Sequence, residues 1–345
     1  MMYAFEDIKH VHLEISSKCN AECPLCPRSF FGYPIDRRYF PEHNMTVEEA
    51  RKIFPPEFVR QLKWIEICGN FGDLVMNPYT VEICEYFKSE NRSVVIEAHT
   101  NAGGRDSKFW QDLARLRVLV YFDLDGLEDT HAIYRKNTVF ATVMKNAQTF
   151  IKAGGYATWK MIKFEHNQHQ IQECERLSSE LGFSHFILID NGRDCGPSFN
   201  REKKIEFFFK PDQWHARKVP TDFDILYDGH FDPAHTQSSY EKYKKQTSSK
   251  RIECRAIQDK SIYVSSIGEV FPCCWTGMHP RTFTNNSDHG FGMNQIKNLM
   301  AGNNALENDL RDCVKWFDSV EENWHQSSYG EGRLIVCDMA CGKDQ

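Results

Sequence analysis

The sequence predicts an α/β fold in which a partial (β/α)6 parallel barrel is followed by a small cysteine-rich module with a β-hairpin. Two observations lead to this prediction. Over the first two thirds of the 345 residues, short runs rich in β-branched and aromatic residues alternate with helix-like stretches. Beyond residue 252 the composition changes, and six of the 13 cysteines lie there. Strands that alternate with helices form parallel sheets with right-handed crossovers.

The expected strands and helices follow one another along the first 190 residues. Thr46 and Glu49 form a capping box that begins the first helix, and Pro55 and Pro56 end it. Strands are expected at residues 11–15, 64–67, 94–98, 118–124, 157–164 and 185–189, and the later helices at residues 79–88, 108–116, 139–152 and 170–181. In parallel barrels the loops at the carboxyl ends of the strands carry the chemistry.

The chain is expected to divide where this alternation stops. Residues 1–200 would form the barrel, residues 201–251 a connector, and residues 252–345 the cysteine-rich module. The connector has charges of both signs, little periodicity and three prolines, which indicates a segment that wraps the surface. In the module, short strands at residues 261–265 and 269–271 flank a turn at Gly268 and predict the hairpin.

Composition limits the classes of protein that the chain fits. A net charge of −6 and a charged fraction of 26% exclude a broadly basic nucleic-acid-binding protein. No apolar run reaches the roughly 20 residues that a membrane-spanning helix needs, and the N-terminus lacks the pattern of a secretory signal. We therefore expect a cytoplasmic protein without membrane or nucleic-acid partners. An odd set of 13 cysteines then indicates metal or redox chemistry rather than disulfides.

Three cysteines directly follow the first expected strand. Cys19, Cys23 and Cys26 lie within eight residues, so their thiolates can converge on one centre. Sulfur ligands favour zinc or iron–sulfur over magnesium or calcium. A structural zinc site needs four ligands, and no fourth ligand completes this loop, whereas a 4Fe–4S cluster held by three cysteines leaves one iron open. A zinc knuckle and incidental buried cysteines are the alternatives.

The Cys-x3-Cys-x2-Cys spacing after the first strand of a partial barrel resembles the radical S-adenosylmethionine (SAM) superfamily. The resemblance implies that the three cysteines hold a 4Fe–4S cluster whose open iron binds SAM. It further implies reductive cleavage of SAM to a 5′-deoxyadenosyl radical, which abstracts a hydrogen atom from the substrate. Leu25 departs from the family pattern, which often has an aromatic residue there, and so weakens a stacking contact near the adenine.

Further stretches at the ends of expected strands resemble SAM-contacting motifs of the same family. The loop after the second strand resembles a Gly-Gly-Glu motif, for which a glycine-rich turn after a buried strand is the alternative. Asp123 replaces the usual hydroxyl, so we expect it to face a ribose hydroxyl or the substrate. The resemblance covers about residues 8–190 and implies SAM contacts from Gly69, Gly72, Asp73, Thr100, Asn101, Asp123 and Asn167.

The C-terminal cysteines resemble a twitch module, the shorter relative of the SPASM extension found on many radical SAM enzymes. The resemblance implies an auxiliary second 4Fe–4S cluster with four ligands, namely Cys254, Cys273, Cys337 and Cys341. A four-cysteine zinc site is the alternative, because zinc also folds a module with little core of its own. Cys274 is a substitute ligand or a packed thiol, and Cys313 lies in a helix expected at residues 310–320. The other cysteines expected in the core are Cys68, Cys84 and Cys174.

Side chains for substrate chemistry are harder to assign from the sequence. Asp194 and Cys195 follow the sixth strand on the catalytic side, where a carboxylate could deprotonate the substrate and a thiol could donate a hydrogen atom. Loop residues without a role are the alternative. His10 and His12 share one face of the first strand, and we expect no metal role for them.

The resemblance leaves the substrate open. Our first expectation is oxidation, cross-linking or rearrangement of a peptide or protein side chain. A dehydrogenase or isomerase of a small polar metabolite, such as a sugar or aminosugar, is the second, and a non-enzymatic zinc- or cluster-containing binding protein is the third. The first two need an electron donor such as flavodoxin or ferredoxin.

Overall fold

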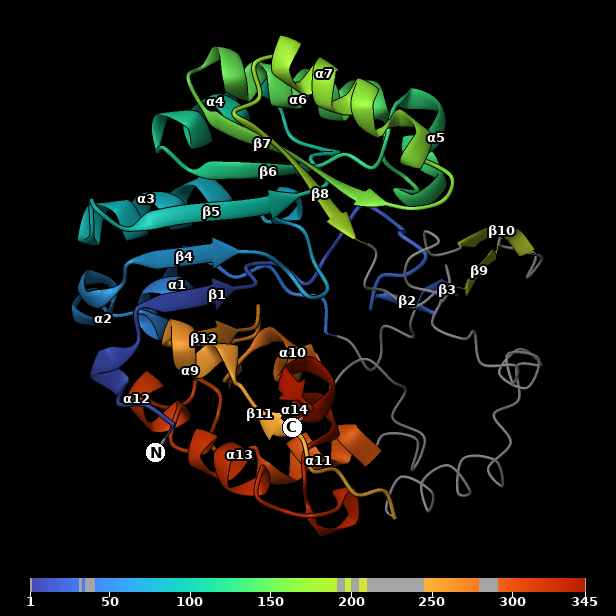
Figure 1. Cartoon of the computed structure of the whole chain (residues 1–345). Helices are drawn as coiled ribbons and strands as arrows, with labels where there is room; N and C mark the ends of the chain where they lie inside the picture. The colour runs from blue at the N-terminus through green and yellow to red at the C-terminus, as the bar shows by residue number, and fades with distance from the viewer. Residues whose placement is uncertain are drawn as a thin grey trace.

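A computed structural model describes residues 2–30, 33–34, 41–190, 196–199, 205–209, 245–278 and 291–344 of the chain. An eight-stranded sheet forms the centre of this part, in the order β13-β12-β1-β4-β5-β6-β7-β8 (Figure 1). The neighbouring strands from β1 to β8 pair in parallel and confirm the predicted partial barrel. The strands of the sheet are β1 (His10–Leu13), β4 (Trp64–Ile67), β5 (Val95–Thr100), β6 (Leu119–Asp123), β7 (Tyr156–Lys163), β8 (His185–Asp190), β12 (Ser261–Val264) and β13 (Val270–Phe271).

Three short strand pairs lie outside this sheet, and all three are antiparallel. They are β2 (Ser29–Phe30) with β3 (Tyr33–Pro34), β9 (Gly196–Phe199) with β10 (Ile205–Phe209), and β11 (Arg251–Ile252) with β14 (Gly342–Lys343). The last pair joins the start of the cysteine-rich region to its end.

Helices connect the parallel strands and lie side by side along one face of the sheet (Figure 1). They are α1 (Val47–Ile53), α2 (Pro56–Gln61), α3 (Thr80–Glu90), α4 (Ser107–Arg115), α5 (Glu128–Tyr134), α6 (Phe140–Lys152) and α7 (Ile171–Glu180). The capping box of Thr46 and Glu49 is present at α1. The sequence analysis missed α2 and α5. Pro56 begins α2 at the first helical position, which proline favours, so the two prolines separate two helices instead of only ending one.

The two faces of the parallel strands differ in polarity. Along β1, β4, β5 and β6, buried residues alternate with half-buried ones. The buried positions are mostly apolar, such as Val11, Ile65 and Ile96, and belong to the main core. The half-buried positions form the inner face of the barrel and carry polar side chains such as Glu66 and His99. This alternation gives the barrel a polar interior on an apolar support.

The C-terminal region continues the barrel sheet. β12 pairs in parallel with β1, and β13 turns back onto β12 through Gly268, whose φ of +83° lies in the left-handed region. The hairpin confirms the prediction, but its place beside β1 was not expected. The helices of this region, drawn in orange and red in Figure 1, are α9 (Arg255–Asp259), α10 (Cys274–Met278), α11 (Phe291–Leu299), α12 (Leu310–Cys313), α13 (Phe317–Asn323) and α14 (Ile335–Cys341).

One continuous hydrophobic core joins the barrel to this region, and it includes Leu310, Trp316 and Phe317 from the C-terminal helices. The helix expected at residues 310–320 is two helices, α12 and α13, separated by a short turn. In the described part of the chain no helix has the length and apolar character needed to cross a membrane. The domain boundaries near residues 200 and 252 stay a prediction.

Candidate active site and cofactor centres

The three cysteines of the N-terminal motif lie on one loop that follows β1. The backbone N–H of Cys26 donates to the carbonyl of Cys23 at 3.0 Å and closes a turn between them. Cys23 is buried beside Phe164, and Cys19 and Cys26 are half-buried against the same small apolar cluster. Burial raises the pKa of the Cys19 thiol, and Asp73 and the other two cysteines raise it further. The three thiols therefore share one electrostatic environment.

Asp73 and Asn101 tie this loop to the ends of the next strands. The Asn101 side-chain amide donates to the Sγ of Cys19 at 3.5 Å and to the Oδ1 of Asn20 at 3.1 Å. The carboxylate of Asp73 accepts from the Thr100 hydroxyl and from the Asn101 backbone N–H, both at 2.7 Å. The chain's own donors thus engage both oxygens of Asp73, which makes it a positioning residue; its contact with SAM stays a prediction.

Two residues of the loop after β4 pack so closely against neighbouring backbone that only glycine fits there. A Cβ on Gly72 would lie 1.7 Å from the carbonyl oxygen of Ser16, and a Cβ on Gly69 would lie 2.4 Å from the carbonyl oxygen of Gly72. Glu14, buried just after β1, accepts from the backbone N–H groups of Phe71 at 2.7 Å and Gly72 at 2.9 Å. Glu14 is not among the expected site residues, although a carboxylate within the first β-rich run is a usable signal.

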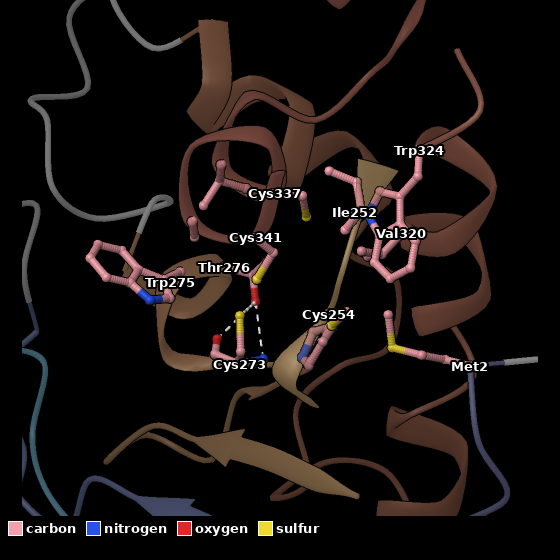
Figure 2. A pocket seen from close by; sticks show the side chains of 13 residues that line it. Met2, Ile252, Cys254, Cys273, Trp275, Thr276, Val320, Trp324, Cys337 and Cys341 are labelled. Atoms are coloured by element: carbon pink, nitrogen blue, oxygen red, sulfur yellow. Dashed lines mark hydrogen bonds between the residues drawn. The ribbon is translucent and has the colours of Figure 1, made fainter. Parts of the chain in front are cut away.

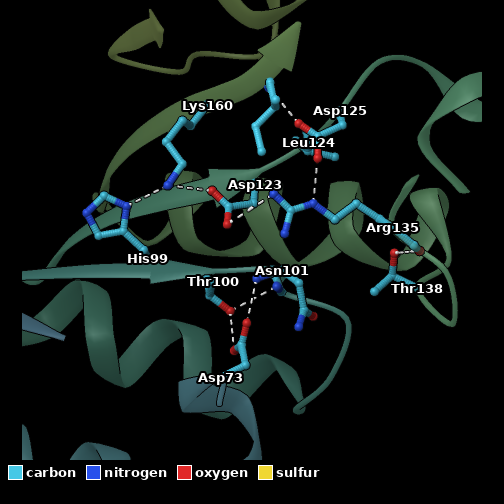
Figure 3. A network of polar contacts seen from close by, with 12 residues as sticks. Asp73, His99, Thr100, Asn101, Asp123, Leu124, Asp125, Arg135, Thr138 and Lys160 are labelled. Atoms are coloured by element: carbon cyan, nitrogen blue, oxygen red, sulfur yellow. Dashed lines mark hydrogen bonds and ion pairs between the residues drawn. The ribbon is translucent and has the colours of Figure 1, made fainter. Parts of the chain in front are cut away.

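Asp123, at the end of β6, is the centre of an ionic network (Figure 3). Its Oδ1 lies 2.8 Å from the Nζ of Lys160, and its Oδ2 lies 3.3 Å from an Nη of Arg135. Lys160 also lies 2.9 Å from the Nδ1 of His99. Burial alone would raise the pKa of Asp123, but the charges of Lys160 and Arg135 outweigh burial and lower it to about 2. Asp123 is therefore ionised and paired, not a free carboxylate.

Asp125 and Asn167 hold the ends of β6 and β7 together. Asp125 is fully buried and accepts from the Nε of Arg135 at 2.5 Å and from the backbone N–H of Ile162 at 2.6 Å. The amide of Asn167 donates to the carbonyl of Ile162 at 2.9 Å and accepts from the N–H of Phe164 at 2.8 Å. The side chain of Asn167 thus supports the backbone, and its expected ribose contact stays a prediction.

The four cysteines expected to hold the auxiliary centre line one cavity in the C-terminal region (Figure 2). Cys254 precedes α9, Cys273 precedes α10, and Cys337 and Cys341 lie one turn apart on α14. Burial raises the pKa of Cys254 to about 11, and the neighbouring Cys273 and Cys341 contribute to the rise. Three separate segments therefore bring four thiols into one electrostatic environment.

Apolar side chains complete the wall of this cavity, among them Met2, Val320 and Trp324 (Figure 2). The Nε1 of Trp324 is buried and has no hydrogen-bond partner of ordinary geometry among the described residues. Burial raises the pKa of the Cys337 thiol, and the side chain of Trp324, which lines the same cavity, opposes this rise. An indole N–H in this position is suited to donate to a metal-bound sulfur.

A buried ion pair anchors the helix that carries two of these cysteines. The Nε of Arg333 donates to the Oδ1 of Asp338 at 2.9 Å, and both side chains are buried. Tyr329 donates to the other oxygen of Asp338 at 3.0 Å. Because Asp338 lies between Cys337 and Cys341 on α14, these contacts fix the direction in which the two thiols point.

The remaining candidates fall into four groups. Cys274 does not line the cavity; it is among the groups that raise the pKa of Cys68, so it lies toward the barrel. Cys313 is buried in the main core, together with Cys84 and Cys174 as expected. The expectation for Cys68 is wrong, because it is only half-buried, on the inner face of the barrel. Asp194 and Cys195 lie outside the described residues.

The two sets of thiols fit different centres. Three cysteines on one loop match a 4Fe–4S cluster that leaves one iron unligated by the protein. Four cysteines around an apolar cavity match a closed centre, and both a 4Fe–4S cluster and zinc satisfy that donor set. The amide of Asn101 and the indole of Trp324 supply N–H groups near sulfur at the first and second site.

Solved structures are similar to this chain in fold. A scan against models of protein families gives no match, and no curated protein is found as a relative. The crystal structure of Streptococcus suis SuiB bound to S-adenosylmethionine matches with a TM-score of 0.56 and 12% identity, over 95% of this chain and 76% of SuiB. Native anSMEcpe with bound AdoMet and Cp18Cys peptide matches with a TM-score of 0.51 and 14% identity, over 94% of this chain and 87% of that one.

A third matching structure is SuiB bound to the precursor peptide SuiA, with a TM-score of 0.54 and 12% identity over 95% of this chain and 75% of SuiB. SuiB and anSMEcpe are radical SAM enzymes. The chain therefore has the radical SAM fold, and the resemblance inferred from the cysteine spacing is confirmed at that level.

Proposed function

We propose that the protein is a radical SAM enzyme whose SAM-binding 4Fe–4S cluster is held by Cys19, Cys23 and Cys26. The observation that carries the proposal is the convergence of these three thiols on one loop at the end of β1, in a chain with the radical SAM fold. When bound, the cluster and SAM supply a 5′-deoxyadenosyl radical, which abstracts a hydrogen atom from the substrate.

The chain's own residues shape this site in three ways. The glycines of the loop after β4 keep its backbone against β1, so that Gly69 and Gly72 can present peptide groups to SAM without a side chain in between. The amide of Asn101 donates to the Cys19 sulfur and offsets negative charge there. The ion pairs of Asp123 remove the repulsion that a free carboxylate would exert on the carboxylate of SAM.

The C-terminal cavity is the proposed auxiliary centre. Its four ligands would be Cys254, Cys273, Cys337 and Cys341, and a 4Fe–4S cluster is our first proposal for its occupant. The indole N–H of Trp324, which has no hydrogen-bond partner among the described residues, is available to donate to a cluster sulfur. Such a cluster would accept an electron from the substrate radical or hold the region together.

A peptide or protein side chain is the proposed substrate. Two of the matching structures contain peptides, namely SuiB with the precursor peptide SuiA and anSMEcpe with the Cp18Cys peptide. The polar inner face of the barrel, with half-buried side chains such as Glu97, offers hydrogen-bonding groups to such a side chain. A small electron-donor protein such as flavodoxin or ferredoxin would supply the electron for SAM cleavage.

The proposal is tested by metal analysis and product analysis of protein purified without oxygen. Two 4Fe–4S clusters would give about eight iron and eight sulfide per chain, and dithionite with SAM would then yield 5′-deoxyadenosine. About four iron with one zinc would keep the radical enzyme and assign zinc to the C-terminal cavity. Reconstituted protein that holds zinc alone and forms no 5′-deoxyadenosine would contradict the proposal.

A further inference from the structure

A third set of ligand-type side chains lies on the inner face of the barrel, outside both cysteine groups. His10 and His12 alternate along β1, and Glu66 alternates with Cys68 at the end of β4. His12 stands directly opposite Glu66 in the parallel register of the two strands. Because side chains two residues apart share a face, this register brings all four to the same face of the sheet.

Glu66 lies at the centre of this set. Its carboxylate oxygens are 3.7 Å from the Nε2 of His10, 3.9 Å from the Nδ1 of His12 and 3.7 Å from the Nε2 of His99. All three distances are too long for hydrogen bonds. They are close to the roughly 3.3–3.8 Å that separates neighbouring ligand atoms around a tetrahedral zinc ion. The ligand atoms of His12, Glu66 and Cys68 all lie within 4.8 Å of one another.

The imidazole of His12 is oriented as a metal ligand would be. Its Nε2 lies 2.6 Å from the backbone carbonyl of Cys68, which can only accept, so Nε2 carries the proton. The lone pair is then on Nδ1, which faces Glu66. The ring of Tyr263 packs edge-on against the imidazole with 5.1 Å between the centroids and holds it in place. Histidine ligands commonly bind a metal through one nitrogen and donate from the other to a carbonyl.

His99 has no ring nitrogen free to bind a metal. Its Nε2 lies 2.7 Å from a carboxylate oxygen of Glu97, and its Nδ1 lies 2.9 Å from the ammonium of Lys160. Both ring nitrogens are therefore already engaged. The Nε2 of His10, by contrast, is buried and has no hydrogen-bond partner among the described residues. The free nitrogens in the set are thus those of His10 and His12.

We propose that His12, Glu66 and Cys68 bind one divalent transition-metal ion of the zinc class. Imidazole, carboxylate and thiolate together match zinc, whereas magnesium and calcium prefer oxygen ligands alone. On binding, the Cys68 thiol gives its proton to solvent and the sulfur bonds to the metal. The site does not depend on SAM chemistry, and it stands on strands β1 and β4, which the barrel core supports.

The test is a zinc titration of the anaerobically purified, cluster-loaded protein. The protein is incubated with Zn²⁺, freed of loosely bound metal, and analysed for zinc and iron. We expect the wild type to retain a zinc ion that Cys68→Ser and Glu66→Gln lose, with cluster iron unchanged in both. His43→Gln is the matched control, because His43 bonds Glu49 at 2.9 Å outside the barrel interior and should keep the zinc.

Zinc K-edge absorption of the wild type separates this site from zinc in the C-terminal cavity. The proposed site gives one sulfur ligand together with nitrogen and oxygen ligands, whereas four cysteines give sulfur alone. Retention of zinc by both Cys68→Ser and Glu66→Gln, a spectrum with sulfur ligands only, or no zinc on the wild type would each overturn the proposal. Failure to form 5′-deoxyadenosine would contradict the proposed function, but it would not change the outcome of the zinc-binding test.

Discussion

The two cysteine groups differ in how far apart their ligands lie along the chain. Cys19, Cys23 and Cys26 occupy one short loop after β1, whereas the other four cysteines come from three segments between Cys254 and Cys341. A local loop can present its thiols as soon as β1 and its neighbours have formed. The C-terminal cavity exists only after α9, α10 and α14 have packed together, so metal binding there is coupled to folding.

The surroundings of the two cysteine groups also differ, because one is polar and the other is apolar. The N-terminal loop is held by polar contacts: the backbone N–H of Asp73 donates to the Lys18 carbonyl, and the Asn101 amide donates to the Cys19 sulfur. The C-terminal thiols face an apolar wall, and the Arg333–Asp338 pair fixes the helix that carries two of them. Under the proposed assignment, the first group would serve exchange of a bound co-substrate and the second permanent ligation. Loss of a ligand should therefore reduce activity in the first case and stability in the second.

The largest expected effect is the loss of SAM cleavage in Cys26→Ala. Removing one of only three ligands should reduce the rate of 5′-deoxyadenosine formation by more than about a thousandfold. This corresponds to a rise of about 4 kcal/mol in the activation free energy. Cys341→Ala should keep part of the activity but lower the unfolding temperature and the iron content. Product analysis with dithionite, together with thermal unfolding, measures both effects.

Cys84→Ala is the matched control, because Cys84 is fully buried in the main core and belongs to neither cysteine group. It should retain cluster iron and SAM cleavage, with a modest loss of stability. An equal loss of SAM cleavage in Cys26→Ala and Cys341→Ala would contradict the division of roles between the two groups.

The next effect concerns Asp123, which supports the N-terminal site alone. Asp123→Asn leaves Lys160 without its buried counter-charge and Arg135 with Asp125 alone, so the unfolding free energy at pH 7 should fall by about 3 kcal/mol. The pKa of Asp123 is lowered to about 2, so its contribution is present above the ordinary carboxyl pKa and is lost as pH falls toward 2. Urea unfolding should show the same difference between wild type and variant at pH 7 and pH 5, and a smaller one below about pH 4.

Asp112→Asn is the control for this prediction, because Asp112 pairs with Lys108 on the surface of α4 and should contribute less than about 1 kcal/mol. Metal content of the C-terminal cavity should stay unchanged in Asp123→Asn. A pH-independent difference, or a loss of the C-terminal metal, would show that the network does not act on the N-terminal site as argued.

A smaller effect distinguishes two glycines that lie near the same site. Gly72→Ala places a Cβ 1.7 Å from the Ser16 carbonyl oxygen and must displace the loop after β4. We expect about 2 kcal/mol of lost SAM binding, about a thirtyfold rise in Kd, measured by calorimetry on cluster-loaded protein. Gly104→Ala is the control, since its Cβ would meet nothing closer than Val75 at 3.8 Å. Equal affinity in the two variants would show that the loop does not contact SAM.

The local parts of the fold could be predicted from the sequence. The six parallel strands lie within two residues of their expected positions, because each is a short β-rich run between recognisable helix signals. The convergence of the C-terminal cysteines also followed, although only through the family resemblance. Pro56 misled the helix assignment, because the same residue is compatible with the end of one helix and the first turn of the next.

The contacts between distant segments could not be predicted. The hydroxyl of Tyr263 donates to Glu14 at 2.6 Å across 249 residues, and this contact fixes the buried carboxylate that holds the loop after β4. Nothing local in residues 261–264 indicates that they pair with β1. His12 and Glu66 likewise become neighbours only through strand register, which is why a metal role for His12 was not expected.

The smallest predicted effect tests what occupies the C-terminal cavity. Trp324→Phe keeps the apolar wall but removes the indole N–H that lies beside the Cys337 sulfur. Because an N–H donor to sulfur stabilises the reduced, more negative form of a cluster, its loss should shift the potential of the auxiliary cluster to more negative values. SAM cleavage should continue, since the N-terminal loop is untouched. Redox titration followed by electron paramagnetic resonance separates the two clusters, and an unchanged potential of a second iron signal would contradict the hydrogen bond. If zinc fills the cavity, only one iron signal exists and neither it nor SAM cleavage responds to Trp324→Phe.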